Sequence, residues 1–286
     1  MTRLRFGFKT EQPRANYPDL VRIWQEADAI ETIDDLWLFD HFVPLRLNLT
    51  DPCPEAWTLL TALAVQTRRA RLGILVSGNT YRHPAVIAKM AATLDIVAGG
   101  RLEFGLGAGW HEGEHRMYGI PLGTTADRIR ALDEACVVIR RLWTEARTSF
   151  SGRYYTLEDA VCEPKPVQPG GPPITIGGTG ERLTLHVVAR HADTWNFNGT
   201  SVDEFVRLNG VLDEHCGALG RDPAAITRSV QIHLGADLAP ARDDAIAFIR
   251  AGAQHIVLNP RTSLESGLPE RVARSLIEPV AASRSA

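Results

Sequence analysis

Short apolar runs of strand type alternate with helical patterns along this chain, and this alternation limits the possible folds more than any other feature. Residues 35–39 are almost continuously apolar and lie between two helical patterns, which is typical of a parallel strand buried on both faces. The same pattern predicts eight strands and eight helices in 286 residues. The expected strands are 4–9, 35–39, 71–77, 101–107, 174–178, 194–197, 227–234 and 255–258, and the expected helices are 18–30, 55–66, 84–97, 124–144, 181–191, 202–219, 241–251 and 269–280.

Eight βα units in a chain of this length favour an α/β fold of the (β/α)8 barrel type, a TIM barrel, over an open doubly wound sheet. The whole chain, 1–286, is expected to form this single domain. One segment departs from the alternation, because residues 149–173 begin with a hairpin-like Ser-Gly-Arg-Tyr-Tyr and carry five prolines between 164 and 173. We therefore expect an insertion around residues 149–173.

The fourth expected strand runs directly into a turn rich in glycine and titratable groups, and we place the active site there. The stretch reads Arg101-Leu-Glu-Phe-Gly-Leu-Gly-Ala-Gly-Trp-His-Glu-Gly-Glu-His115. Gly107 and Gly109 either let a ligand approach the backbone closely or only make a tight turn. A dinucleotide fingerprint is disfavoured, because its third glycine position falls on Trp110.

The same stretch contains a possible zinc motif, since His111 to His115 fit the pattern H-E-x-x-H of zinc proteases. Gly113 lies inside the helix that such a motif needs, and the segment directly follows a glycine turn. A stable helix is therefore doubtful here. A zinc hydrolase stays a rival interpretation, and no metal site is expected.

Polar residues follow other expected strands as well. In a barrel the carboxyl ends of the strands meet at one mouth, where reactive groups are found. The residues at the ends of these other strands are Asp40 and His41, Val76, Ser77 and Asn79, Gly177, Gly178 and Thr179, and Asn196 and Asn198. The Asp40-His41 pair either serves as a general acid or hydrogen-bonding pair or is an ordinary loop feature. The glycine run either holds a phosphate or only forms the turn that enters the next helix. The other histidines, at 83, 186, 191, 215, 233 and 255, are interpreted as structural or surface residues.

Composition excludes several partners. The net charge of −3 gives no nucleic-acid footprint, and no apolar run approaches the roughly 18 residues of a membrane span. The beginning of the sequence has no apolar core of signal-peptide length. The four cysteines are widely spaced and form no C-x-x-C pair, which fits a reducing compartment. A cytoplasmic protein without a membrane or nucleic-acid partner is expected.

Several motifs in order resemble one known family, the luciferase-like monooxygenase superfamily, and within it the branch of deazaflavin (coenzyme F420)-dependent oxidoreductases common in actinobacteria. The motifs are Leu38-Phe-Asp-His-Phe42, Gly78-Asn-Thr-Tyr-Arg-His-Pro84, Gly100-Arg-Leu-Glu-Phe-Gly-Leu-Gly-Ala-Gly-Trp-His111, Ile176-Gly-Gly-Thr-Gly180 and Ala192-Asp-Thr-Trp-Asn196. The resemblance implies a (β/α)8 barrel with a flat deazaflavin across its mouth and hydride transfer at C5 of the ring.

The resemblance also implies site residues. Asp40 and His41 would face the cofactor, and a bulge with a non-prolyl cis peptide near residues 75–77 would support its ring. Together with the strand ends, it gives this cofactor-binding set: Asp40, His41, Leu75, Val76, Ser77, Asn79, Gly107, Ala108, Gly109, Trp110, Gly177, Gly178 and Thr179.

The expected catalytic residues are His41, as a proton donor or a hydrogen-bond partner of the ring, and Glu114, as a possible substitute proton donor. Relatives that oxidise sugar phosphates carry a glutamate where this chain has Trp110, so that reaction is disfavoured. The sequence predicts an F420-dependent oxidoreductase acting on a small organic substrate, as a homodimer. The alternatives are an FMN-dependent luciferase-like monooxygenase, which would activate oxygen, and a cofactor-binding protein without turnover.

Overall fold

A closed barrel of parallel strands forms the centre of the molecule. The computed structural model describes residues 3–45, 48–260 and 264–283. Within these ranges, eight strands run in the order β3-β2-β1-β11-β10-β9-β8-β5, and β3 pairs with β5 to close the barrel. The predicted (β/α)8 barrel is confirmed. Its strands are β1 (Arg5–Lys9), β2 (Asp35–Leu38), β3 (Arg71–Ile74), β5 (Leu102–Gly107), β8 (Ile174–Gly177), β9 (Thr194–Phe197), β10 (Thr227–Leu234) and β11 (His255–Pro260).

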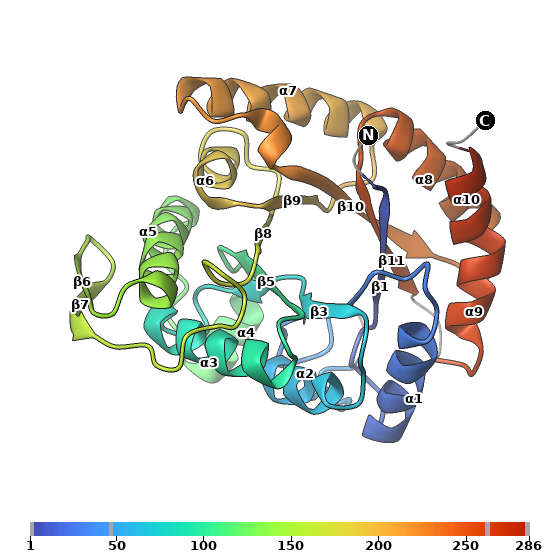
Figure 1. Ribbon diagram of the computed structural model, residues 1–286, viewed down its shortest axis with the longest axis horizontal. Helices are drawn as coiled ribbons and strands as arrows, with labels where there is room; N and C mark the ends of the chain where they lie inside the picture. The colour runs from blue at the N-terminus through green and yellow to red at the C-terminus, as the bar shows by residue number, and fades with distance from the viewer. Residues whose placement is uncertain (1–2, 46–47, 261–263, 284–286) are drawn as a thin grey trace.

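Helices surround the barrel (Figure 1). Each turns an apolar stripe inward, as α5 does with Leu132, Cys136 and Ile139, because its outer face meets water. The helices between and after the barrel strands are α1 (Tyr17–Asp28), α2 (Ala56–Ala64), α3 (Pro84–Val97), α5 (Thr125–Thr144), α6 (Thr184–His191), α7 (Val202–Ala218), α8 (Ala239–Arg250), α9 (Leu268–Val272) and α10 (Glu278–Ser283), with a π-helical turn, Ala273–Ile277, joining the last two and a short 3-10 turn at Pro223–Ala225.

The predicted insertion is present. Strands β6 (Thr148–Ser151) and β7 (Thr156–Ala160) form an antiparallel hairpin, and a proline-rich segment leads from it back to β8. Figure 1 shows the hairpin outside the ring of helices, beside α5. The insertion thus leaves the barrel pairing undisturbed.

The third predicted strand, 71–77, is wrong as one continuous strand. It ends at Ile74, and the Leu75–Val76 peptide bond is cis. The chain then pairs with β5 again through the short β4 (Ser77–Gly78). The cis peptide that the family resemblance implied near residues 75–77 is therefore confirmed.

A second correction concerns the segment after β5. We expected no stable helix there, but α4 runs over Glu112–Tyr118. The ring of His111 accepts a hydrogen bond from the Glu114 backbone N–H at 3.0 Å, and Gly119 ends the helix with a φ of 66°. These two caps stabilise a short helix even though Gly113 lies inside it.

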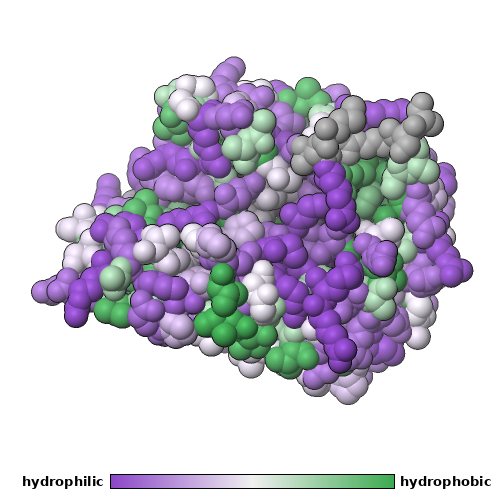
Figure 2. All heavy atoms as spheres, in the orientation of Figure 1, coloured by the Kyte–Doolittle hydropathy of each residue, from purple (hydrophilic) through white to green (hydrophobic). Residues whose placement is uncertain are grey.

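The molecular surface is mostly hydrophilic on the face shown in Figure 2, with apolar side chains gathered below its centre, where Figure 1 shows α2 and α3. Val65 at the end of α2 and Val97 at the end of α3 line one shallow groove and are both exposed. Across the ranges that the structure describes, none of the helices has the length and apolar character needed to span a bilayer.

Candidate active site

A cavity of about 630 Å³ opens at the carboxyl ends of the barrel strands. The structure places most of the expected cofactor-binding residues on its wall. These are Asp40, His41, Leu75, Val76, Ser77, Gly107, Ala108, Gly109, Trp110, Gly177, Gly178 and Thr179. Two expected site residues are absent from the wall. Asn79 is buried and donates to the hydroxyl of Tyr155 at 3.0 Å, and Glu114 lies behind His41.

The imidazole of His41 is held from behind by a buried carboxylate. His41 follows β2, whereas Glu114 comes from the first turn of α4, and their Nδ1 and Oε2 atoms are 2.7 Å apart. The other oxygen of Glu114 accepts the backbone N–H groups of Phe42 and Val43 at 2.6 and 3.1 Å. The hydroxyl of Tyr81 donates to Oε2 at 2.5 Å. Glu114 is fully buried, so these donors replace all of its water.

This environment keeps Glu114 ionised. Burial alone would raise the pKa of its carboxyl, but the hydrogen bonds from His41 and Tyr81 outweigh burial and lower the pKa to about 2. The same carboxylate, together with burial, raises the pKa of Tyr81. Because an ionised carboxylate can only accept, the proton between Glu114 and His41 belongs to Nδ1 of the imidazole. Nε2 is then the ring nitrogen left for a ligand.

The low pKa of Glu114 has a measurable consequence for stability. A carboxyl whose pKa falls from about 4.5 to about 2 on folding stabilises the folded state fully above pH ~5 and loses that contribution as the pH falls toward 2. We expect Glu114→Gln to lower the free energy of unfolding by about 3 kcal/mol at pH 7, and the difference from wild type to shrink steadily below pH 5. Urea unfolding from pH 7 to pH 3 measures it. A difference that stays constant over this range contradicts the assignment.

Asp40, the other half of the Asp-His pair, is engaged by an arginine that sequence analysis did not single out. Arg82 binds both carboxylate oxygens of Asp40, at 2.6 and 3.1 Å, and reaches Glu55 at 2.5 Å. Burial raises the pKa of Asp40 in spite of Arg82, which acts to lower it. Asp40 therefore shapes the wall of the cavity, while its charge is directed at Arg82.

Several cavity residues were missed by sequence analysis: Lys9, Glu11, Arg128, Gln231, His233 and Asn259. His233, which we interpreted as structural or surface, lies on the wall. A period-2 reading of the strand 227–234 points to two of them, because Ser229, Gln231 and His233 alternate onto one face. Arg128 belongs to α5, its guanidinium donates to the carbonyl of Gly109 at 3.0 Å, and it lines the same cavity as the glycine run 177–180.

The geometry does not favour the zinc motif. His115 uses both ring nitrogens inside the protein, with Nδ1 2.8 Å from the carbonyl of His111 and Nε2 2.7 Å from the hydroxyl of Thr80. His111 caps α4, and Glu114, one of the two glutamates between these histidines, binds His41. In the part of the chain that the structure describes, no group of three or more potential ligands is arranged to hold a metal.

Comparisons with known proteins agree on one family. The family model described as luciferase-like monooxygenase matches residues 2–278. The chain is 33% identical over 242 residues to an F420-dependent glucose-6-phosphate dehydrogenase of Kineococcus radiotolerans, covering 84% of this chain and 70% of that protein.

Solved structures share the fold. The chain superposes on an F420-dependent secondary alcohol dehydrogenase in complex with an F420-acetone adduct with a TM-score of 0.86 at 18% identity, covering 97% of this chain and 99% of that one. It superposes on a coenzyme F420-dependent tetrahydromethanopterin reductase from Methanopyrus kandleri with a TM-score of 0.81 at 16% identity, covering 97% and 99%.

Proposed function

Because the chain belongs to the luciferase-like monooxygenase family, in its branch of F420-dependent oxidoreductases, we propose that it transfers a hydride between coenzyme F420 and a small organic substrate. The observation that carries the proposal is His41 on the cavity wall, held from behind by Glu114. It supplies a titratable nitrogen of fixed orientation where hydride transfer requires a proton to be given or taken.

The residues of the cavity fit a flat cofactor. The volume of about 630 Å³ lies in the range of roughly 300–1,000 Å³ that is usual for ligand sites. Leu75, Val76 and the glycine-rich end of β5 give an apolar wall, and Arg128 with the glycine run 177–180 gives a polar end suited to a phosphate. These residues would hold the deazaflavin, which when bound supplies the hydride at C5.

The chain's own residues would handle the proton. Glu114 fixes His41 through Nδ1, so that Nε2 can donate a proton to the oxygen of a substrate carbonyl whose carbon gains the hydride, or accept the hydroxyl proton in the opposite direction. Glu114 is thus proposed as a positioning residue and not as the proton donor, because it is buried and its pKa is about 2. Arg82 keeps Asp40 and the adjoining His41 loop in place.

The substrate side of the cavity is aromatic. Trp110 is 62% exposed, and its ring lies 5.6 Å from the ring of His41, edge to face. An indole beside His41 suits an apolar or planar substrate better than a sugar phosphate, since it offers no acceptor to a sugar hydroxyl. We therefore do not propose glucose 6-phosphate as the substrate, although the Kineococcus relative is named for it.

Fluorescence titration of the purified protein with F420, and in parallel with FMN, tests the proposal. Micromolar binding of F420 with much weaker binding of FMN is the expected result, and reduced F420 should then be oxidised by some member of a screen of small carbonyl compounds. Tight FMN binding would instead favour an FMN-dependent monooxygenase, to be checked by oxygen consumption. Binding of F420 without turnover of any compound would leave a cofactor-binding protein.

Two further expectations belong to the proposal. We infer a homodimer that covers the groove in which Val65 and Val97 are exposed, and sedimentation of wild type against Val97→Asp tests it. We also place the enzyme in the cytoplasm, in line with the four unpaired cysteines at 53, 136, 162 and 216.

A further inference from the structure

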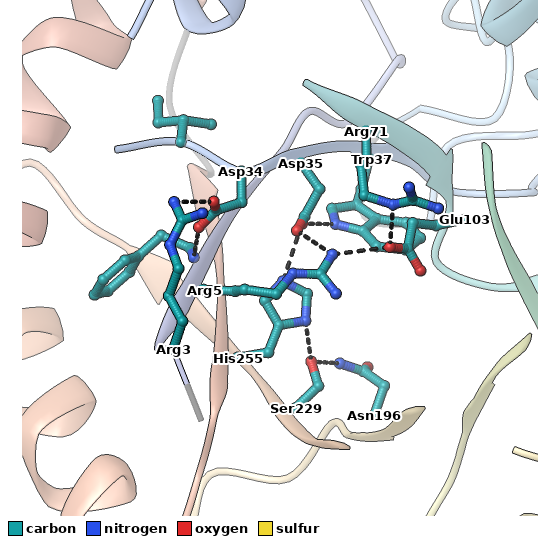
Figure 3. Close-up of polar contacts among 12 residues, drawn as sticks. Arg3, Arg5, Asp34, Asp35, Trp37, Arg71, Glu103, Asn196, Ser229 and His255 are labelled. Carbon is teal, nitrogen blue, oxygen red and sulfur yellow. Dashed lines mark hydrogen bonds and ion pairs between the residues drawn. The ribbon is translucent and has the colours of Figure 1, made fainter. Parts of the chain in front are cut away.

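Below the cavity, a column of buried polar side chains crosses the inside of the barrel (Figure 3). Asp35 begins β2, His255 begins β11, Ser229 lies on β10 and Asn196 on β9. The last three stand at one level, because Asn196 is in register with Ser229 and Ser229 with His255. All four are almost completely buried, and Asn196 also lines the cavity above.

Hydrogen bonds link the column without a gap from the cavity to the base of the barrel. Lys9 Nζ donates to Gln231 Oε1 at 2.9 Å, and Gln231 Nε2 donates to Asn196 Oδ1 at 2.7 Å. Asn196 Nδ2 donates to Ser229 Oγ at 3.0 Å. The Ser229 hydroxyl and His255 Nδ1 are 3.0 Å apart, and His255 Nε2 lies 2.9 Å from Asp35 Oδ1.

The two ends of the column fix its direction. An ammonium can only donate and an ionised carboxylate can only accept, so Lys9 and Asp35 both require donors to point toward Asp35. Burial works against ionisation of Asp35, but His255 and Arg5 outweigh it and hold the pKa of Asp35 well below its usual range. His255 Nε2 is the donor to this carboxylate, and because Asn196 Nδ2 already donates to Ser229 Oγ, the direction of the column assigns His255 Nδ1 as the acceptor of the Ser229 hydroxyl.

The opposite orientation of the two amides is unfavourable at the cavity end of the column. Turning both amides around would place the Gln231 NH2 group against the Lys9 ammonium, two donors facing each other. It would also require Ser229 to donate upward and His255 to be protonated on both nitrogens. The observed direction gives each donor along the column an acceptor, and aligned bonds of this kind strengthen one another in a low-dielectric interior.

The barrel has room for this column because residue 7 of β1, which faces inward, is a glycine. A Cβ atom at Gly7 would lie 2.2 Å from Asp35 Oδ1 and 3.1 Å from His255 Nε2. At the base, Arg5 joins Asp35 to Glu103 at 2.8 and 2.9 Å, and Arg71 also binds Glu103. The carboxylate end is therefore both accommodated and neutralised by residues of three other strands.

We propose that Asp35, His255 and Ser229 are positioning residues that set the direction of the Asn196 and Gln231 amides. Both amide oxygens are turned to partners within the column, and each NH2 group has a second hydrogen besides the one bonded there, so the Asn196 and Gln231 side chains offer N–H donors to the cavity that they line. Such a floor selects the edge of a ligand that carries oxygen acceptors, such as carbonyl or anionic oxygens. The inference rests on the proposed function only for the ligand, F420, used in one of its two tests.

The first test needs no ligand. In ¹⁵N spectra of the free protein, assigned by difference with His255→Gln, we expect neutral His255 protonated on Nε2. Ser229→Ala should shift the side-chain amide resonances of both Asn196 and Gln231, although the column links Gln231 to Ser229 through Asn196. Thr67→Val is the matched control, since its hydroxyl is also buried but bonds to the Leu63 carbonyl and to Arg101, which are not members of the column. A doubly protonated His255, or an unmoved Gln231 amide, overturns the proposal.

The second test measures binding. Ser229→Ala should weaken F420 about 5- to 30-fold, which corresponds to about 1–2 kcal/mol, whereas Ser229→Thr, which keeps the hydroxyl, should restore binding. Thermal unfolding of both variants separates this effect from loss of fold. An unchanged dissociation constant in a folded Ser229→Ala protein counts against the proposal. If wild type itself fails to bind F420, the proposed function fails, and the amide spectra alone decide on the column.

Discussion

Replacement of His41 by glutamine is expected to lower kcat by about 10²- to 10⁴-fold, the range lost when a positioned acid–base group is removed. Glutamine preserves much of the length of the side chain and can still hydrogen-bond to Glu114, but it cannot exchange a proton at neutral pH. The dissociation constant of F420 should change much less than kcat, because the cavity wall is otherwise intact. The assay is the oxidation of reduced F420 by a substrate identified in the screen, followed by fluorescence.

A matched control for this variant is His186→Gln, on the outer helix α6, where the imidazole lies against that of His215 and away from the cavity. Its kcat should equal that of wild type. If His41→Gln retains more than about a tenth of the wild-type kcat, the proton passes through another group, and Nε2 of His41 has no role in the chemical step.

The largest effect on stability is expected at Gly105, in the middle of β5. A Cβ atom there would lie 1.9 Å from the carbonyl oxygen of Ile74, and the obstacle is backbone that no rotamer change can remove. Gly105→Ala would have to push β3 away from β5 at the point where these strands close the barrel. We expect a loss of about 3 kcal/mol or more in the free energy of unfolding, at the upper end for overpacked interiors. Chemical unfolding at neutral pH measures it.

Gly210→Ala is expected to change the free energy of unfolding in the opposite direction. Gly210 lies in the exposed face of α7, and a Cβ atom added at this position would meet nothing within 4 Å. Alanine there should raise the free energy of unfolding by about 0.5–1 kcal/mol, because it restricts the unfolded chain and favours the helix. Equal effects of the two substitutions would show that the barrel tolerates movement between β3 and β5, and would refute the packing argument.

The fold could be predicted from the sequence because each barrel strand and helix has a strong local pattern. Continuous apolar runs such as 35–39 and amphipathic stretches such as 124–144 specify their own structure and, in alternation, the barrel. The interruption of the strand 71–77 at Leu75 has no such local signal, and only the family resemblance indicated it. The helix at 112–118 was missed because its caps, His111 and Gly119, are side-chain and backbone interactions that hydrophobic periodicity does not record.

The site was predictable to the extent that barrel strands end where ligands bind. This rule placed His41, Trp110 and the glycine run on the cavity wall. It could not predict which side chains bind these residues. Glu114 contacts His41 across 73 positions of sequence, and Arg82 contacts Asp40 across 42. Such pairings depend on the three-dimensional closure of the barrel, and a single sequence contains no local pattern for them.

The vacant inward position at Gly7 also limits the order in which sequences of this kind can diverge. A side chain at position 7 collides with Asp35 and His255, so it becomes acceptable only after one of them has been replaced by something smaller. Loss of Asp35 or His255 alone would leave buried, unpaired polar groups beside Arg5 and Ser229. Mutational histories that fill this position must therefore pass through a less stable intermediate, which makes the three residues a unit that is inherited or abandoned together.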